Sequence, residues 1–177
     1  MNKNNYLSLG LTDVVLDELC DAQKAILRQH PDSGFEPVAR DALHMTVCFF
    51  GEALQHLKEW ERVEFSKDVQ DTIHKAGYIR LTNPRIVKFP PGKENLYVVR
   101  YDTNTAGQAL VKNLKRRLAR FCVHDKKDIW IPHVTLGKAR RLGEVDYIFH
   151  SMLEPTEIKL CGKLRCNESS SRMWNWT

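Results

Sequence analysis

Two short segments of this chain repeat the same pattern of side chains. His44-Met45-Thr46-Val47 and His133-Val134-Thr135-Leu136 each read histidine, apolar, threonine, apolar. Successive side chains of a strand point to opposite faces, so an extended backbone places the imidazole and the hydroxyl of each copy on one face. The apolar pair then packs on the other face. The repeat therefore predicts two similar strands which, if they face each other, form a symmetric site for a phosphate.

Imidazole and hydroxyl groups suit the chemistry of a phosphodiester. Hydrolysis needs a base for the attacking water and an acid for the leaving oxygen, and histidine, with a reference pKa of about 6.5, can serve as either. Threonine hydroxyls can donate to the non-bridging oxygens. We therefore expect His44 and His133 to be catalytic, and Thr46 and Thr135 to bind the phosphate. The sequence does not decide which histidine is the acid.

This scheme needs no metal ion. The chain has no H-E-x-x-H segment, no aspartate-rich loop and no glycine-rich phosphate loop, so we expect neither a metal site nor another cofactor. A single His-x-Thr triplet is a weak signal, because chance predicts roughly 0.4 copies in a chain of this composition. Two copies on predicted strands, each followed by an apolar residue, are far less probable by chance.

The rest of the chain mixes strands and helices without regular alternation. Helices are predicted for residues 12–28, 56–76, 103–121 and 145–152, and strands for residues 6–11, 35–38, 43–50, 78–81, 85–89, 95–101, 129–137, 156–163 and 172–176. Such an order favours an α+β fold with antiparallel sheets. Each half reads strand, helix, histidine-containing strand. We therefore expect one domain over residues 1–177, made of two intertwined, pseudo-symmetric lobes with one motif strand each.

The second predicted helix has a candidate inner face of apolar residues. Its members recur at roughly helical spacing, and they are Leu57, Trp60, Val63, Val69 and Ile73. We expect this face to pack against a sheet.

The composition is that of a soluble intracellular protein, with 42% hydrophobic and 28% charged residues. The first five residues are polar, and no apolar run approaches the roughly 20 residues of a membrane helix, so we expect neither a signal peptide nor a membrane partner. The five cysteines are odd in number and form no C-x-x-C pair, which favours free thiols in a reducing compartment. We expect a cytoplasmic monomer, with a nuclear location as the alternative.

The formal net charge of +5 is concentrated in one region. Residues 112–141 contain ten Lys and Arg residues but only two Asp, whereas the rest of the chain is net acidic. A basic zone around the second motif suits an anionic ligand. The other interpretation is a solvated helix face, which is the usual role of such charge.

In their wider context the two motifs resemble the 2H phosphoesterase superfamily, whose signature is a pair of H-x-[TS]-apolar motifs. Residues 41–52 (DALHMTVCFFGE) and 130–138 (WIPHVTLGK) resemble the motif regions of the branch that includes RNA 2′,3′-cyclic phosphodiesterases, also called 2′-5′ RNA ligases. The resemblance spans residues 6 to about 163. It implies a bilobal fold of two small antiparallel sheets with outer helices and a central groove. It also implies His44 and His133 as the acid–base pair; we assign His44 as the acid and His133 as the base.

The resemblance implies a metal-independent phosphodiesterase that opens 2′,3′-cyclic phosphates of RNA or nucleotides. Its partners would be RNA ends or small nucleotides with a 2′ linkage. A close rival is a phosphodiesterase of 2′-5′ oligoadenylate, which the same site would permit. A rival of another class is a non-catalytic RNA-binding module that uses the basic zone, with the groove as a platform.

Further residues near the motifs are candidate substrate contacts. Trp130 and Phe50 could stack on a nucleobase, although aromatic residues beside a strand are more often core. Tyr6 is a third candidate. Lys138 stands where the family often has arginine, but strict alternation turns it away from the motif histidine unless a bulge intervenes. Cys48 either lines the groove beside the motif or packs as a bystander thiol.

Overall fold

The computed structural model describes residues 4–89, 95–121, 129–141, 143–155 and 157–162, and the backbone of residues 172–175. Its strands are β1 (Asn5–Leu9), β2 (Glu36–Pro37), β3 (Met45–Gly51), β4 (Leu81–Phe89), β5 (Leu96–Thr103), β6 (His133–Lys138), β7 (Glu157–Cys161) and β8 (Arg172–Asn175). Its α-helices are α1 (Asp13–Gln29), α2 (Glu59–His74) and α3 (Thr105–Arg117). Short 3₁₀ turns span Pro31–Ser33, Arg40–Ala42, Ala53–His56 and Ala119–Phe121.

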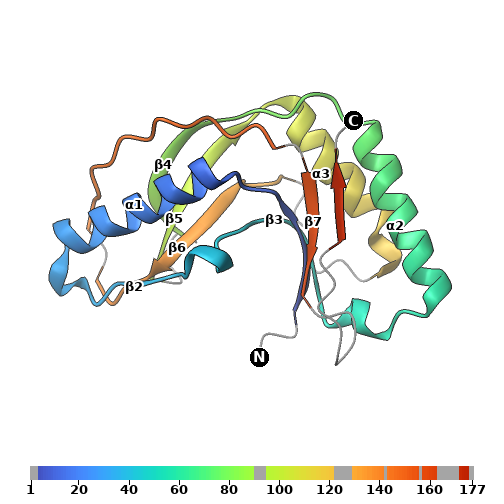
Figure 1. Cartoon of the computed structure of the whole chain (residues 1–177), viewed down its shortest axis with the longest axis horizontal. Coiled ribbons are helices and arrows are strands. Elements are labelled where there is room, and N and C mark those ends of the chain that lie inside the picture. The colour runs from blue at the N-terminus through green and yellow to red at the C-terminus, as the bar shows by residue number, and fades with distance from the viewer. Residues whose placement is uncertain are drawn as a thin grey trace.

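The described strands form two antiparallel sheets of four strands each (Figure 1). One has the order β3-β1-β7-β8, and the other has the order β2-β6-β5-β4. The predicted α+β class with antiparallel sheets is therefore confirmed. The first motif begins one residue before β3 and continues into it, and the second lies on β6, so each sheet carries one motif. Both sheets also combine strands from the two halves of the sequence, because β7 joins β1 and β2 joins β6.

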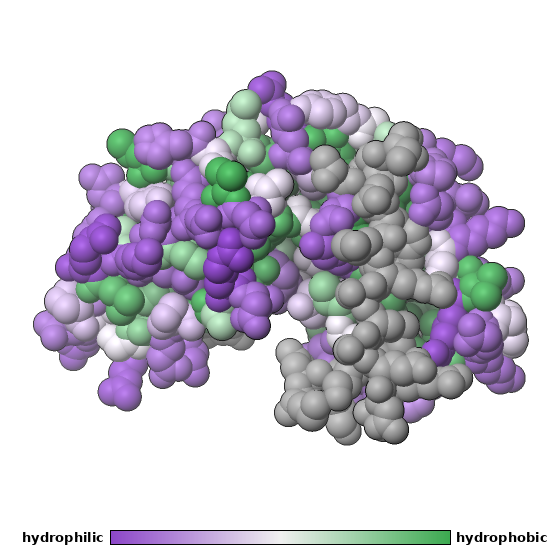
Figure 2. Space-filling model, viewed as in Figure 1, coloured by the Kyte–Doolittle hydropathy of each residue, from purple (hydrophilic) through white to green (hydrophobic). Residues whose placement is uncertain are grey.

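The helices lie on the outer sides of the two sheets (Figure 1). Helix α1 packs on β6, whereas α3 packs on β3 and α2 contacts β8. The N-cap of α1 is Thr12, whose hydroxyl accepts a hydrogen bond from the Val15 amide. In the space-filling view the outward surface over α1 is mainly hydrophilic (Figure 2). One contiguous set of buried apolar side chains from both sheets and from the helices that cover them forms the core.

Helix α2 corrects the predicted inner face. Its buried residues are Phe65, Val69, Thr72 and Ile73, whereas Trp60 and Val63 are 57% and 58% exposed. The prediction for these two residues was wrong. Phe65 belongs to the buried side of the helix. Val63 precedes it by two residues, or about 200° around a helix of 3.6 residues per turn, so it lies on the opposite, exposed side. Apolar character alone did not indicate which stripe faces the core.

The predicted helix over Val145–Met152 is also wrong. Residues 143–152 form an irregular extended segment that runs along the length of α1 (Figure 1). Its backbone polar groups bond to side chains of α1 instead of to each other: Gln29 donates to the Asp146 carbonyl and accepts from the Asp146 amide. The Glu18 carboxylate likewise accepts from the amides of His150 and Ser151. These bonds replace the helical ladder that the sequence pattern suggested.

Gly137 provides a test of the packing beside the second motif. A Cβ added there would overlap the carbonyl oxygen of Glu36 and the ring of Phe35. We expect Gly137→Ala to lower the free energy of unfolding by about 1–3 kcal/mol, the usual cost of overpacking. Urea unfolding monitored by circular dichroism measures this. Gly77→Ala is the matched control, because its Cβ would lie 3.5 Å from that of Ala106; an equal loss in both variants would contradict the packing described here.

Candidate active site

Each motif strand has one extra residue immediately after its threonine. In the β1–β3 pair Ser8 lies opposite Thr46 and Leu7 lies opposite Cys48, so Val47 is the extra residue. In the β5–β6 pair Val98 lies opposite Thr135 and Tyr97 lies opposite Gly137, so Leu136 is extra. Such a bulge changes which side chains beyond it face a given side of the sheet. The two motifs therefore match in backbone geometry as well as in sequence.

The two imidazoles are held in the same way. The Nδ1 atom of His44 lies 2.7 Å from the carbonyl oxygen of Ala42, and that of His133 lies 2.8 Å from the carbonyl oxygen of Ile131. A carbonyl oxygen can only accept, so each Nδ1 carries a hydrogen. This leaves Nε2 of each ring as the atom that can exchange a proton with a ligand.

An aromatic ring lies against each imidazole. The ring of Tyr6 lies 4.5 Å from that of His44 between centroids, and the ring of Phe89 lies 4.4 Å from that of His133. The interplanar angles are 30° and 32°. Phe89 belongs to β4, which is separated from β6 by β5. Each histidine is therefore restrained by a hydrogen bond in its plane and by an aromatic ring over its face.

The environment of His133 favours its neutral form. Burial lowers its pKa, and the nearby charge of His44 lowers it further, whereas the hydrogen bond to Ile131 acts in the opposite direction. His44 is thus close enough to His133 for its charge to act on that ring. Beside them, burial raises the pKa of Tyr6 to about 12, so its phenol stays protonated and can donate a hydrogen bond.

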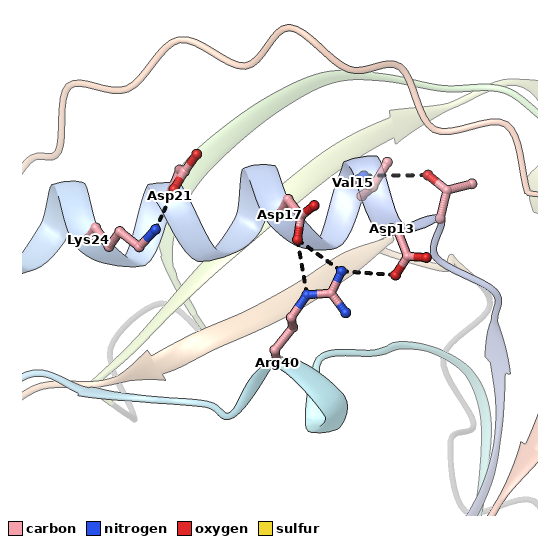
Figure 3. Close-up of polar contacts among 7 residues, drawn as sticks. Asp13, Val15, Asp17, Asp21, Lys24 and Arg40 are labelled. Carbon is pink, nitrogen blue, oxygen red and sulfur yellow. Dashed lines mark hydrogen bonds and ion pairs between the residues drawn. The ribbon is translucent and has the colours of Figure 1, made fainter.

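The carbonyl that orients His44 belongs to a segment docked on α1. This segment is the 3₁₀ turn Arg40–Ala42, and the Arg40 side chain reaches up to the first turns of the helix (Figure 3). Its guanidinium lies 2.9 Å from carboxylate oxygens of both Asp13 and Asp17. The three side chains are substantially exposed, so each ion pair contributes little free energy. Together they fix the position of the turn that precedes the first motif.

A hydrogen bond connects the segment that precedes the second motif with the first motif. The indole Nε1 of Trp130 donates to the carbonyl oxygen of Thr46 over 3.0 Å. The Trp130 backbone is held in turn by Gln108 of α3, which donates to its carbonyl and accepts from its amide over 2.7 and 3.0 Å. Trp130 thus bridges the two sheets beside the histidines.

A cavity of about 220 Å³ lies between the two motif strands. Thr46 of one motif and His133 of the other both line it, together with Val47, Phe49, Phe89, Ile129, Trp130 and Ile131. The wall is mostly apolar and aromatic, with the threonine and the histidine as its main polar side chains. The cavity can accept a flat apolar group next to a polar one.

The structure brings most of the predicted site residues together. Thr135 is half-buried on the same face of the sheet as His133. Tyr6 lies against His44, and Trp130 lines the cavity although it is only 6% exposed. The contact of Tyr6 and Trp130 with a ligand stays a prediction.

Phe50 requires a correction. It is fully buried and packs edge-on against Phe65, so it does not reach the cavity. The bulge at Val47 explains the difference, since it turns Phe49 toward the cavity and Cys48 into the core. Sequence reasoning missed Phe49 because strict alternation assigns it to the opposite face.

The bulge at Leu136 returns Lys138 to the face of His133 and Thr135. Leu96 lies opposite Lys138 and Val98 lies opposite Thr135, and alternate residues of β5 share one face. The Lys138 ammonium lies 2.9 Å from the carboxylate of Glu36 and lines a different pocket from His133. Sequence reasoning also missed Phe89, since no local pattern links β4 to the second motif.

Part of the basic zone is neutralised by α2. Arg117 pairs with Asp68 and Asp71, and Arg120 pairs with Glu64 and Asp68. These arginines join α3 and the turn after it to α2. Lys126 and Lys127 lie outside the described residues.

Cys20, Cys48 and Cys161 form no disulfide with one another, and Cys122 and Cys166 lie outside the described residues. Within the described ranges no three His, Cys, Asp or Glu side chains meet in a way that could hold a metal ion. No helix in the same part of the chain combines the length and the apolar character that a bilayer crossing requires.

Comparison with known proteins identifies the fold. Neither a protein-family model nor a curated protein matches the sequence. Among solved structures, the protein TT0787 of Thermus thermophilus matches with a TM-score of 0.69 and 17% identity, over 96% of this chain and 94% of that protein. E. coli LigT complexed with phosphate matches at 0.66 and 17%, over 99% and 98% of the two chains. The MHV ns2 PDE domain matches at 0.56 and 15%, over 99% of each chain.

These three proteins are members of the 2H phosphoesterase superfamily, and this chain has their fold. The resemblance that the two motifs indicated is thereby confirmed at the level of the fold. Because one fold can host different activities, the chemistry depends on the side chains described above.

The Trp130 bridge can be tested without any ligand. We expect Trp130→Phe, which keeps a large ring but removes the Nε1 donor, to lower the free energy of unfolding by about 1–3 kcal/mol because the Thr46 carbonyl loses its partner. Urea unfolding measures the change. Trp60→Phe, at an exposed position on α2, is the matched control and should stay within about 0.5 kcal/mol of the parent protein. Equal stability of the two variants would refute the bridge.

Proposed function

We propose that this chain is a metal-independent phosphodiesterase that hydrolyses the 2′,3′-cyclic phosphates of RNA or nucleotides. One observation carries the proposal: two imidazoles on facing sheets are anchored in the same way, through Nδ1 to the carbonyl two residues earlier. Both rings therefore have Nε2 available for proton transfer. A pair of such groups beside one cavity is the arrangement that general acid–base hydrolysis needs.

The environment of His133 favours its role as the base, which leaves His44 as the acid. His133, whose pKa is lowered by burial, is neutral at physiological pH and takes a proton from the attacking water at Nε2. The water oxygen bonds to phosphorus as the bond from phosphorus to one ribose oxygen breaks. His44 gives its Nε2 proton to that leaving oxygen. A phosphomonoester results, and the proton gained by His133 balances the proton lost by His44.

The threonines and the cavity complete the proposed site. The hydroxyl of Thr135 shares the sheet face of His133, and Thr46 lines the cavity with His133; both would donate to the non-bridging phosphoryl oxygens. The apolar wall formed by Phe49 and Ile129 would take the nucleobase. The fold supports this reading, since E. coli LigT, which shares it, has been crystallised with phosphate and with 3′-AMP.

The rival of a non-catalytic RNA-binding module is less well supported. It relies on the basic zone, but Arg117 and Arg120 are already paired with acidic residues of α2. Such a module also gives no reason for two histidines to be anchored identically. A 2′-5′ oligoadenylate phosphodiesterase would use the same histidines. This alternative differs from the proposal only in the substrate that is cleaved.

A substrate panel tests the proposed activity. The protein is incubated with EDTA and, in separate reactions, a 2′,3′-cyclic nucleotide, an RNA ending in a cyclic phosphate, and 2′-5′ oligoadenylate. We expect turnover of the cyclic phosphates, with loss of about 10²–10⁴-fold in kcat for His44→Ala and for His133→Ala, because each removes one proton transfer. His56→Ala, outside both motifs, is the control. If the parent protein turned over none of these substrates, the proposal of an enzyme would be refuted. Turnover of oligoadenylate alone would favour the 2′-5′ oligoadenylate phosphodiesterase.

The pH dependence tests the roles of the histidines. The base must be unprotonated, so kcat/KM should rise with pH as His133 loses its proton and fall again when the acid loses its own. Because burial lowers the pKa of His133, the midpoint of the acidic limb should lie below the ordinary histidine value of about 6.5. An acidic limb centred above that value would argue against His133 as the buried base.

A second measurement separates this effect from catalysis. The charge of His44 contributes to the low pKa of His133. The His133 resonance in His44→Gln should therefore titrate at a higher pH than in the parent protein when followed by NMR. An unchanged titration would show that the two rings do not share one site.

A further inference from the structure

A second pocket lies beyond the histidines, at the far end of β6. It has a volume of about 410 Å³ and is larger than the cavity beside His133. Its polar walls come from Glu36, Asn95, Lys138 and Arg140, and Leu96 contributes an apolar side. Among the described residues, two cationic side chains and one carboxylate border the pocket, and cationic groups are therefore in excess there.

The pocket lies on the same face of the sheet as the second motif. Across β5 and β6, the pairs Arg100–His133, Val98–Thr135 and Leu96–Lys138 occupy successive rows of one face. Four residue steps of about 3.3 Å along β5 separate the first row from the last, or roughly 13 Å. A ligand that extends along this face from His133 toward the end of β6 therefore reaches the pocket.

The backbone of Arg140 is fixed by hydrogen bonds, and its side chain has a defined position beside Gly34. Its amide donates to the Ser33 carbonyl over 2.9 Å, its carbonyl accepts from Asn95, and the stem of its side chain lies against Gly34. In the described part of the chain no carboxylate pairs with its guanidinium. A guanidinium that is positioned by its backbone and lacks a counter-ion is suited to bidentate contact with a phosphate.

Lys138 can change partners at little cost. Its pair with Glu36 is 2.9 Å long, but both side chains are about two-thirds exposed. Exposed ion pairs contribute little to stability, so a phosphate can compete for the ammonium. The carboxylate of Glu36 repels an anion, so removal of its charge should strengthen the binding of a phosphate in the pocket.

We propose that this pocket binds the phosphate backbone of an RNA strand whose cyclic-phosphate end lies at His44 and His133. This inference rests on the proposed function and extends it: the preferred substrate is an oligonucleotide, because a mononucleotide held at the histidines leaves the pocket empty. Arg140 makes the main contact, and Lys138 contributes once it is released from Glu36.

The test compares two substrates of the same chemistry, cytidine 2′,3′-cyclic phosphate and a five-nucleotide RNA that ends in the same group. Arg140→Gln should lower kcat/KM about five- to tenfold for the oligonucleotide and less than twofold for the mononucleotide. Arg141→Gln is the matched control, since Arg141 lines a neighbouring pocket with Asp32 and should leave both values unchanged. Glu36→Gln should raise kcat/KM for the oligonucleotide two- to threefold.

A binding experiment keeps the inference separate from the proposed activity. Fluorescence anisotropy with a labelled five-nucleotide RNA ending in a 3′-phosphate requires no turnover. Arg140→Gln should weaken binding, and should reduce the slope of log K against log salt concentration by about 0.7, the value for one contact with a single strand. If no substrate were turned over, the proposed function would be overturned. The anisotropy measurement would then still decide whether the pocket binds RNA.

Three outcomes would overturn the inference. The first is an equal effect of Arg140→Gln on the two substrates, which would assign the arginine to the mononucleotide site. The second is an equal effect of Arg140→Gln and Arg141→Gln on RNA binding, which would indicate diffuse attraction only. The third is weaker RNA binding by Glu36→Gln.

Discussion

The site depends on one extra residue in each motif strand. Without the bulges at Val47 and Leu136, strict alternation would place Cys48 on the face of the first motif and would turn Lys138 away from the second. With them, Phe49 lines the cavity and Lys138 returns to the face of His133. A bulge also increases the local twist of a strand. The same irregularity therefore sets both the lining of the cavity and the direction in which the groove continues.

Amide side chains on the helices hold this irregular backbone in place. Gln23 of α1 donates from Nε2 to the carbonyls of both Val38 and Leu136, each over 2.8 Å, and so joins the Val38 amide as a second donor to the bulged residue. Gln108 of α3 clamps the backbone of Trp130 in a comparable way. A bulge leaves ladder groups unpaired, and a buried unpaired carbonyl is costly. The two glutamines thus stabilise the backbone geometry that the histidines need.

Charge is distributed unevenly over this scaffold. The arginines at the C-terminal end of α3 form ion pairs with α2, where they hold helices together. Arg140, by contrast, lies next to an open pocket. Burial acts on His133 in another way, since it lowers the pKa of this ring and so favours its neutral form. A count of basic residues along the sequence does not separate these roles, because each depends on which side chains lie nearby.

The sequence by itself determined three of the predicted helices, most of the strands and the two motifs, because hydrophobic period and the repeated His-x-Thr pattern are local signals. Helix α1 followed from such a signal. Tertiary structure alone decided the rest. The segment over Val145–Met152 is extended because Glu18 and Gln29 satisfy its backbone, and these partners are more than a hundred residues away. Phe89 reaches His133 only through strand order. Bulges, ion pairs and pockets arise between segments, so no local pattern carries them.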